Sequence, residues 1–300
     1  MSATTKIEWC DATFNPWTDC TKWGPDCDNC YAASFSLRVG GPDYRKGVPR
    51  RRCNGFEKSA MALARKAAKL GKRLKVFPSL CDVFDAEVPS EWRADFWRVV
   101  DATRDRLDWL ILTKRTENVA GMLPDGWGDG WAGVWLGMSA GDQKTFDRRV
   151  GDFLRVRAAL HFLSYEPAFG PLNAEVKINF RRPDGSHWST TTVWFQWVII
   201  GGESGPGARP FHTGWARSII AQCAESKTAC FVKQLGARPL CTGEGIYSPQ
   251  GVPMTLADPK GGDMAEWPAD LRVRQWPAQV PRVERVGRGA YRATPHAGSE

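Results

Sequence analysis

The stretch Trp109-Leu-Ile-Leu-Thr113, followed by Lys114 and Arg115, shows the pattern on which the fold prediction depends. A short apolar run that ends in polar residues is typical of a buried strand in a parallel sheet. Similar runs recur at 74–80, 134–138, 161–165, 197–200 and 230–233. Helical patterns lie between them, near residues 57–70, 90–106, 143–158 and 213–226. With a first strand before Cys20, about six or seven β/α units predict an α/β protein with a full or partial parallel β/α barrel, related to the TIM barrel.

Three segments interrupt this alternation. Residues 38–56 form a basic loop rich in Gly and Pro, and residues 174–193 contain a Pro-Asp-Gly turn that predicts an inserted β-hairpin. The sequence after residue 237 is again rich in Pro and Gly. We therefore expect a barrel domain over 1–240 and an irregular C-terminal extension over 241–300, with a disordered tail. Ser90 is expected to cap the helix that follows it.

Composition narrows the classes of function. The chain has 300 residues, a hydrophobic share of 42% and a net charge of +8. A basic balance favours phosphate-bearing partners. No apolar run reaches the length of a membrane span, so no membrane association is expected. The fifteen tryptophans could stack on unpaired bases beside arginines, or could pack the core.

A compact group of cysteines follows the expected first strand. Cys20, Cys27 and Cys30 have the spacing C-x6-C-x2-C, and Tyr31 comes directly after. Three thiolates can hold three irons of a [4Fe–4S] cluster and leave the remaining iron open to a small molecule. A closed zinc site prefers four ligands, so three cysteines favour an open metal site. The Cys-x-x-Cys-Tyr end resembles the signature of radical S-adenosylmethionine (SAM) enzymes, although the first gap is longer than in the common pattern.

A zinc site is the alternative. Cys10 lies upstream and could complete a site of four sulfurs. The protein would then be a zinc-stabilised nucleic-acid-binding protein without catalysis, with the loop residues Arg50, Arg51 and Arg52 on phosphates. The first residues have no apolar core for a signal peptide, so we expect a cytoplasmic, reducing location, where clustered cysteines bind metals or act in catalysis.

Polar residues follow most of the expected strands, and the carboxyl ends of strands carry the chemistry in parallel β/α barrels. These residues are Asp82, Lys114, Ser139, Glu166, Gly201, Gly202, Glu203 and Lys233. For each residue alone, a helix cap or a loop salt bridge is an equally good explanation. We expect the set to face one cavity together with the cysteine loop.

Physical roles can be assigned to this set. Gly201 and Gly202 would let the backbone approach a ligand closely. Glu166 and Glu203 could bind the ammonium group or the ribose hydroxyls of SAM. Positive side chains could neutralise a carboxylate or phosphate, and Tyr31 could pack over the cluster or the adenine. The residues expected to bind the cofactor are thus Tyr31, Asp82, Ser139, Gly201, Gly202 and Glu203, and those expected to act in catalysis are Lys114, Glu166 and Lys233.

Most of the chain also resembles a phage and prophage family of formerly unknown function, which is similar to radical SAM proteins in its cysteine loop and its barrel. The segments that carry the resemblance span residues 6–240 and include Lys6 to Thr18, Cys20 to Ala32, Leu110 to Arg115, Glu166-Pro167, Gly201 to Ser204 and Phe231 to Gly236.

The resemblance implies a radical SAM enzyme, of isomerase, lyase or transferase type, that generates a 5′-deoxyadenosyl radical. Its cofactors would be a [4Fe–4S] cluster on Cys20, Cys27 and Cys30 and SAM itself. The expected substrate is DNA or a nucleotide, in thymidine hypermodification of phage DNA or in photoproduct repair. A reductase or a flavodoxin-type protein would donate electrons, in the cytoplasm of the host cell if the gene is carried by a phage.

Overall fold

The computed structural model describes residues 5–42, 44–45, 47–181, 187–242, 251–278, 282–287 and 290–294. The chain divides into two compact units. The first comprises Met1–Ser139, Gly151–His161 and Ala278–Glu300, and the second comprises Ala140–Val150 and Phe162–Pro277.

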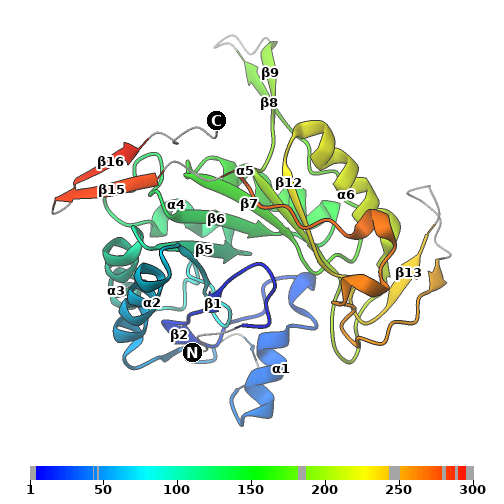
Figure 1. The fold of residues 1–300 in the computed structure, drawn as a ribbon, viewed down its shortest axis with the longest axis horizontal. Coiled ribbons are helices and arrows are strands. Elements are labelled where there is room, and N and C mark those ends of the chain that lie inside the picture. Colours follow the sequence, from blue (N-terminus) through cyan, green and yellow to red (C-terminus); the bar gives the residue numbers. More distant parts are fainter. Residues whose placement is uncertain are drawn as a thin grey trace. The chain divides into compact units, whose positions relative to one another are not determined.

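Seven strands form one curled parallel sheet that helices flank, consistent with a partial β/α barrel (Figure 1). Their order in the sheet is β1 (Ala12–Thr13), β4 (Leu74–Phe77), β5 (Leu107–Thr113), β6 (Val134–Ser139), β7 (Leu160–Tyr165), β10 (Trp197–Gly201) and β12 (Ala229–Gln234). Strand order therefore follows chain order, as it does in a β/α barrel. All residues of β6 and β10 are buried, which is expected when both faces of a parallel sheet are covered.

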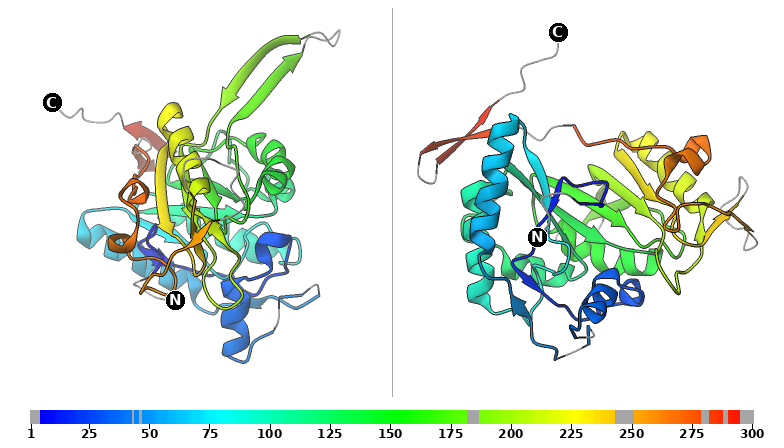
Figure 2. Two further views of the ribbon diagram at one scale, coloured as in Figure 1. Left: turned by 90° about the vertical axis from the view of Figure 1, so that its right-hand side faces the viewer. Right: turned by 60° about the horizontal axis from the view of Figure 1, so that its bottom comes forward.

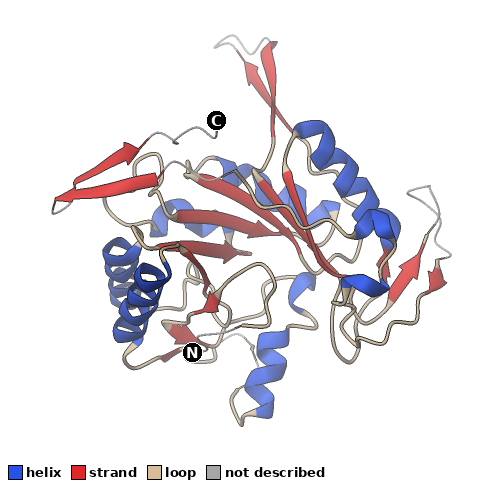
Figure 3. Ribbon diagram, viewed as in Figure 1, coloured by secondary structure: helices blue, strands red, loops and turns tan. Residues whose placement is uncertain are grey.

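The helices of the first unit include two that the sequence pattern did not predict. The predicted ones are α2 (Phe56–Leu70) and α3 (Ser90–Thr103), which lie beside each other (Figure 3). The additional ones are α1 (Tyr31–Arg38) and α4 (Thr116–Met122). Both are short, so their apolar periodicity is weak. The expected cap was one residue off, because Ser90 is the first helical residue and Pro89 occupies the N-cap position.

The remaining helices agree with the prediction. Helix α5 (Gln143–Leu154) follows β6, and α6 (Thr213–Ser226) lies in the second unit before β12. The part of the chain that the structure describes also contains three short 3-10 helices: η1 (Pro25–Cys27), η2 (Met264–Glu266) and η3 (Ala269–Leu271).

Aromatic side chains pack both units from within. In the first unit Trp109 lies edge-on to Phe14 at 5.0 Å and to Phe96 at 5.7 Å, and its indole N–H donates to the hydroxyl of Thr103. In the second unit Trp197 packs against Phe231 at 6.1 Å. Trp109 and Trp197 are fully buried, so they serve the core rather than base stacking.

Smaller sheets lie outside the main one (Figure 2). The inserted hairpin is confirmed as β8 (Val176–Arg181) and β9 (His187–Val193), which pair antiparallel, and residues 182–186 of the insertion lie outside the described residues. The other pairings join β2 (Trp17–Thr18) with β3 (Arg51–Arg52), β11 (Phe211–His212) with β13 (Pro239–Cys241), and β13 with β14 (Val252–Pro253).

The predicted disordered tail is described only in part. Strands β15 (Arg282–Gly287) and β16 (Ala290–Thr294) pair antiparallel within it. Residues 279–281, 288–289 and 295–300 lie outside the described residues, so the domain boundary at 240 and the disorder of the tail stay predictions.

Gly133 precedes β6 with a φ of +80°, and an added Cβ would meet the carbonyl oxygen of Arg104 and the guanidinium of Arg73. We expect Gly133→Ala to destabilise the protein by more than about 2 kcal/mol, because left-handed backbone costs a side chain about 1–2 kcal/mol before any overlap. Gly151→Ala is the control, since Gly151 lies within α5 with open space around it; it should gain about 0.5–1 kcal/mol. Urea unfolding of both variants measures the difference, and equal midpoints would contradict it.

Candidate functional site

The three predicted metal ligands lie in one loop between β1 and α1. Cys20 precedes η1, Cys27 is its last residue, and Cys30 is the N-cap of α1. The chain enters the loop through Asp19, whose φ of +76° is a left-handed conformation that Asp tolerates better than most residues. The buried carboxylate of Asp19 accepts hydrogen bonds from Arg51, the shorter at 2.7 Å.

Two of the three thiols border the same apolar cluster. Cys20 and Cys30 pack against Ala32, Ala33 and Tyr44. Cys27 is buried, and each of the nine cysteines is a free thiol. The cysteine loop therefore packs against the first turn of α1, which contains Ala32 and Ala33.

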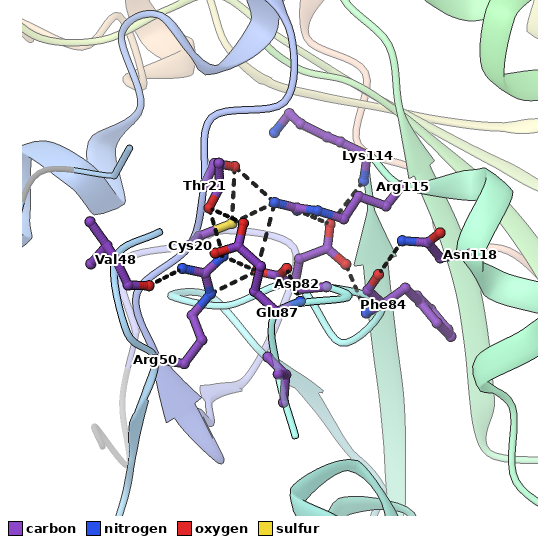
Figure 4. A network of polar contacts seen from close by, with 12 residues as sticks. Cys20, Thr21, Val48, Arg50, Asp82, Phe84, Glu87, Lys114, Arg115 and Asn118 are labelled. Carbon is purple, nitrogen blue, oxygen red and sulfur yellow. Dashed lines mark hydrogen bonds and ion pairs between the residues drawn. The ribbon is translucent and has the colours of Figure 1, made fainter. Parts of the chain in front are cut away.

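Arg115 ties the first cysteine to the sheet (Figure 4). Its Nη2 donates to the Sγ of Cys20 at 3.4 Å and to the carbonyl oxygen of Thr21 at 2.8 Å. Its Nη1 pairs with Asp82 at 3.0 Å, and Asp85 lies 3.7 Å from Nη2. Only 4% of the Arg115 side chain is exposed, so these contacts replace its hydration.

Asp82 is the hub on the other side of this arginine. Its carboxylate accepts hydrogen bonds from the hydroxyl of Thr113 at 2.8 Å and from the backbone N–H groups of Lys114 and Phe84. The ends of β4 and β5 are thereby linked at the point where the cysteine loop lies. Asp82 was predicted to bind a cofactor; its carboxylate is hydrogen-bonded within its own chain, and a contact with a cofactor stays a prediction.

A second buried arginine closes the network. Arg50 pairs with Asp85 at 2.7 Å and donates to the hydroxyl of Thr21 at 2.7 Å and to the carbonyl oxygen of Val48. Its side chain is 1% exposed. The prediction that Arg50 contacts phosphate is therefore wrong for this residue, because its charge is used inside the protein.

The neighbouring arginines are more exposed and also have acidic partners. Arg51 pairs with Asp19, and Arg52 pairs with Asp95 at 2.5 Å. Arg51 keeps 57% of its side chain exposed. On the inserted hairpin, Lys177 is exposed and lies 3.4 Å from Glu175. The predicted phosphate contacts of Arg181 and Arg182 concern side chains outside the described residues.

Burial controls the ionisation of this region. It raises the pKa of Cys20 to about 11, and nearby Arg115 only partly offsets that effect. Burial raises the pKa of Cys81 in the same way, with Asp82 adding to the rise. Without a metal both thiols are therefore protonated at neutral pH, and a metal bound by Cys20 must displace its proton.

Two further predicted residues of the first unit have different environments. Tyr31 is 52% exposed, and its hydroxyl donates to the carbonyl oxygen of Ser79. Ser139 is buried at the end of β6. Whether either side chain contacts a cofactor stays a prediction.

The second unit brings Glu166 and Lys233 together. The Nζ of Lys233, on β12, lies 2.7 Å from Oε2 of Glu166, which follows β7. The other carboxylate oxygen, Oε1, is buried and has no hydrogen-bond partner. Gly201 lies against this carboxylate, since a Cβ there would sit 3.1 Å from Oε2. Gly202 packs against Leu235, where a side chain would not fit.

Glu203 is committed to a neighbouring arginine. Its Oε2 accepts the backbone N–H of Arg209 at 2.8 Å, and its Oε1 accepts Nε at 3.1 Å. The guanidinium of Arg209 also stacks on the ring of Phe169 at 4.0 Å. A ligand ammonium at Glu203 would compete with this pair.

The structure thus joins Cys20 and Asp82 in the first unit and Glu166, Gly201 and Lys233 in the second. That all of these face one cavity stays a prediction. Among the described residues no three His, Cys, Asp or Glu side chains form a group that could hold a metal ion. The residue types are those that hold iron–sulfur clusters, because three soft thiols share one short loop. The binding of such a cluster stays a prediction.

A cavity of about 1000 Å³ lies elsewhere in the first unit. It runs between α3 and residues 121–132 and is lined by Trp97, Trp127 and Trp131. None of the predicted site residues lines it.

Sequence reasoning missed the buried ionic network. Asp85 was not singled out, and Arg50 was expected at the surface. The sequence feature that indicated this network was the polar run after Leu112. In the structure Thr113 and Arg115 both donate hydrogen bonds to the carboxylate of Asp82.

We expect Arg115→Met to destabilise the fold by about 3–5 kcal/mol, because it leaves Asp82 buried without its cation. Arg155→Met is the matched control: it also breaks an ion pair, with Asp152, but 79% of the Arg155 side chain is exposed, so the loss should stay below about 1 kcal/mol. Urea unfolding at neutral pH measures both. Equal losses in the two variants would show that the network does not depend on Arg115.

No helix in the described part of the chain is long and apolar enough to cross a membrane. Comparison with curated proteins and with solved structures gave no match. Comparison with protein families gave a match over residues 4–257 to the family described as protein of unknown function (DUF5131). The match includes the cysteine loop, the buried arginine network and the Glu166–Lys233 pair, and the chain belongs to this family.

Proposed function

We propose that this protein is an iron–sulfur enzyme of the radical SAM type that acts on a nucleic-acid base or a modified nucleotide. The observation that carries the proposal is the cysteine loop: three thiols within eleven positions, of which Cys20 and Cys30 border one apolar cluster. Cys20, Cys27 and Cys30 would hold the iron–sulfur cluster. When bound, such a cluster supplies the electron that cleaves SAM.

The surrounding residues are suited to hold such a loop in place. Arg115 donates to the sulfur of Cys20 and fixes the carbonyl of Thr21, while Arg50 fixes the hydroxyl of Thr21. Both arginines are anchored on Asp85. Hydrogen bonds to ligand sulfurs are one of the means by which proteins tune iron–sulfur potentials, so Arg115 would both orient Cys20 and stabilise its thiolate.

The Glu166–Lys233 pair supports a ligand site in the second unit. The unpartnered Oε1 of Glu166 can accept a hydrogen bond from a ligand hydroxyl or ammonium group. Lys233 donates to Oε2 of Glu166 and can itself meet an anionic group. Gly201 is buried beside this pair, where an added Cβ would crowd the Glu166 carboxylate. Glu166 and Lys233 are thus the groups of this unit that we assign to SAM or substrate.

The substrate assignment depends on charge and on resemblance. The net charge of +8 favours a phosphate-bearing substrate. The resemblance to phage proteins points to hypermodification of thymidine in phage DNA or to repair of a pyrimidine photoproduct. A reductase or flavodoxin-type protein would supply electrons.

Substitution of the cysteines tests the metal site. We expect Cys20→Ala, Cys27→Ala and Cys30→Ala each to lose the cluster, since an open site has no spare ligand. Cys10→Ala is the control, because the Cys10 thiol faces the carbonyl of Ile7 in its own turn. Anaerobic reconstitution followed by iron and sulfide analysis measures the outcome. Loss of metal in Cys10→Ala as complete as in the other three would favour a zinc site of four sulfurs.

Activity is measured separately. The reconstituted protein with SAM and a strong reductant should form 5′-deoxyadenosine, and DNA should change the rate. A colourless protein that binds one zinc per chain and forms no 5′-deoxyadenosine would contradict the proposal.

A further inference from the structure

Exposed apolar side chains are concentrated beside the cysteine loop. Nine large apolar side chains are exposed in the described part of the chain, and five of them lie between residues 23 and 39. Three are aromatic: Trp23 is 46% exposed, Tyr31 52% and Phe35 44%. A concentration of this kind marks an interaction site more often than chance exposure does. Trp23, Tyr31 and Phe35 are called the aromatic face below.

The rings of this face are presented from a defined support. Tyr31 and Phe35 are four residues apart on α1 and therefore lie on the same side of the helix. Helix α1 projects from the first unit (Figures 1 and 2), while its inner residues Ala32 and Ala33 are buried. The hydroxyl of Tyr31 is tied to Ser79. Trp23 lies 5.3 Å from the guanidinium of Arg115, so the face connects directly to the network that holds Cys20.

Basic residues outnumber acidic ones among the exposed charged residues near the aromatic face in the sequence. In the described part of residues 20–52, the exposed charged residues are Lys22, Asp28, Arg38, Arg45, Arg51 and Arg52. Asp28 is the one acid among them. Arg38 lies in the last turn of α1, three residues beyond Phe35. Aromatic rings interleaved with cations are the arrangement that binds unpaired bases by stacking and their phosphates by charge.

We propose that the aromatic face binds single-stranded or unpaired nucleic acid, with bases stacked on Phe35 and Tyr31 and phosphates on Arg38 and its basic neighbours. The inference rests on the proposed function, which names nucleic acid as the substrate, and it assigns the surface that receives it. This surface replaces the arginine cluster as the main contact, because Arg50 is buried and the guanidinium groups of Arg51 and Arg52 pair with Asp19 and Asp95. A protein partner would use the apolar area but would not need rings.

The test measures binding of a fluorescein-labelled single-stranded oligodeoxynucleotide by fluorescence anisotropy, with a duplex of the same sequence for comparison. Phe35→Ala should weaken single-strand binding by roughly five- to a hundredfold, the loss of one stacked base. Arg38→Gln should lower the slope of log affinity against log salt by about 0.7. The wild type should prefer the single strand to the duplex.

Matched controls distinguish base stacking from nonspecific apolar or electrostatic binding. Leu37→Ala removes an exposed apolar side chain from the same helix, and Arg65→Gln removes an exposed charge from α2. Both variants should bind as the wild type does. Since Phe35 is partly exposed, Phe35→Ala should keep the wild-type circular dichroism spectrum and melting temperature.

Three results would overturn the inference. If Phe35→Ala bound the single strand with wild-type affinity, the Phe35 ring would not be part of the interface. An equal loss in Leu37→Ala would show that general apolar contact, and not ring stacking, holds the strand. Equal affinity for duplex and single strand would show that base stacking does not contribute to binding. Metal content and 5′-deoxyadenosine formation without DNA are measured on the same variants, so a failure of the proposed function shows itself independently of strand binding.

Discussion

The guanidinium of Arg115, buried between Asp82, Asp85 and the sulfur of Cys20, is the interaction on which the candidate site depends. Burying this charge is costly unless each of its donors is used. Its partners come from the cysteine loop and from the loop after β4, while Arg115 itself follows β5. The same contacts that keep the charge stable therefore fix the position of the first cysteine relative to the sheet.

Much of the fold could be predicted because parallel strands are buried on both faces. Runs such as Trp109 to Thr113 and Trp197 to Ile200 are continuous and apolar, and their pattern alone indicates buried strands. Helices α1 and α4 were not predicted, because each spans about two turns and shows little apolar periodicity. Their positions depend on tertiary contacts, such as Ala32 and Ala33 against Tyr44, which no local pattern encodes.

The candidate site was predictable only where chemistry follows from residue type and spacing. The cysteine loop and the strand-end residues Asp82, Glu166 and Lys233 were visible in this way. The buried partners were not, because an arginine in a basic loop has the same sequence signature whether it faces solvent or, like Arg50, an internal carboxylate. The exposure of the aromatic rings beside the cysteines could not be predicted either, since aromatic residues usually pack in the core.

The central claim is that the three cysteines leave one iron of a cluster open to SAM. Mössbauer spectroscopy of the protein reconstituted with ⁵⁷Fe, with and without SAM, tests it most directly. The account predicts that SAM changes the signal of a single iron site and leaves the others as they were. A spectrum that SAM does not change would contradict it, because every iron would then already have a full set of ligands.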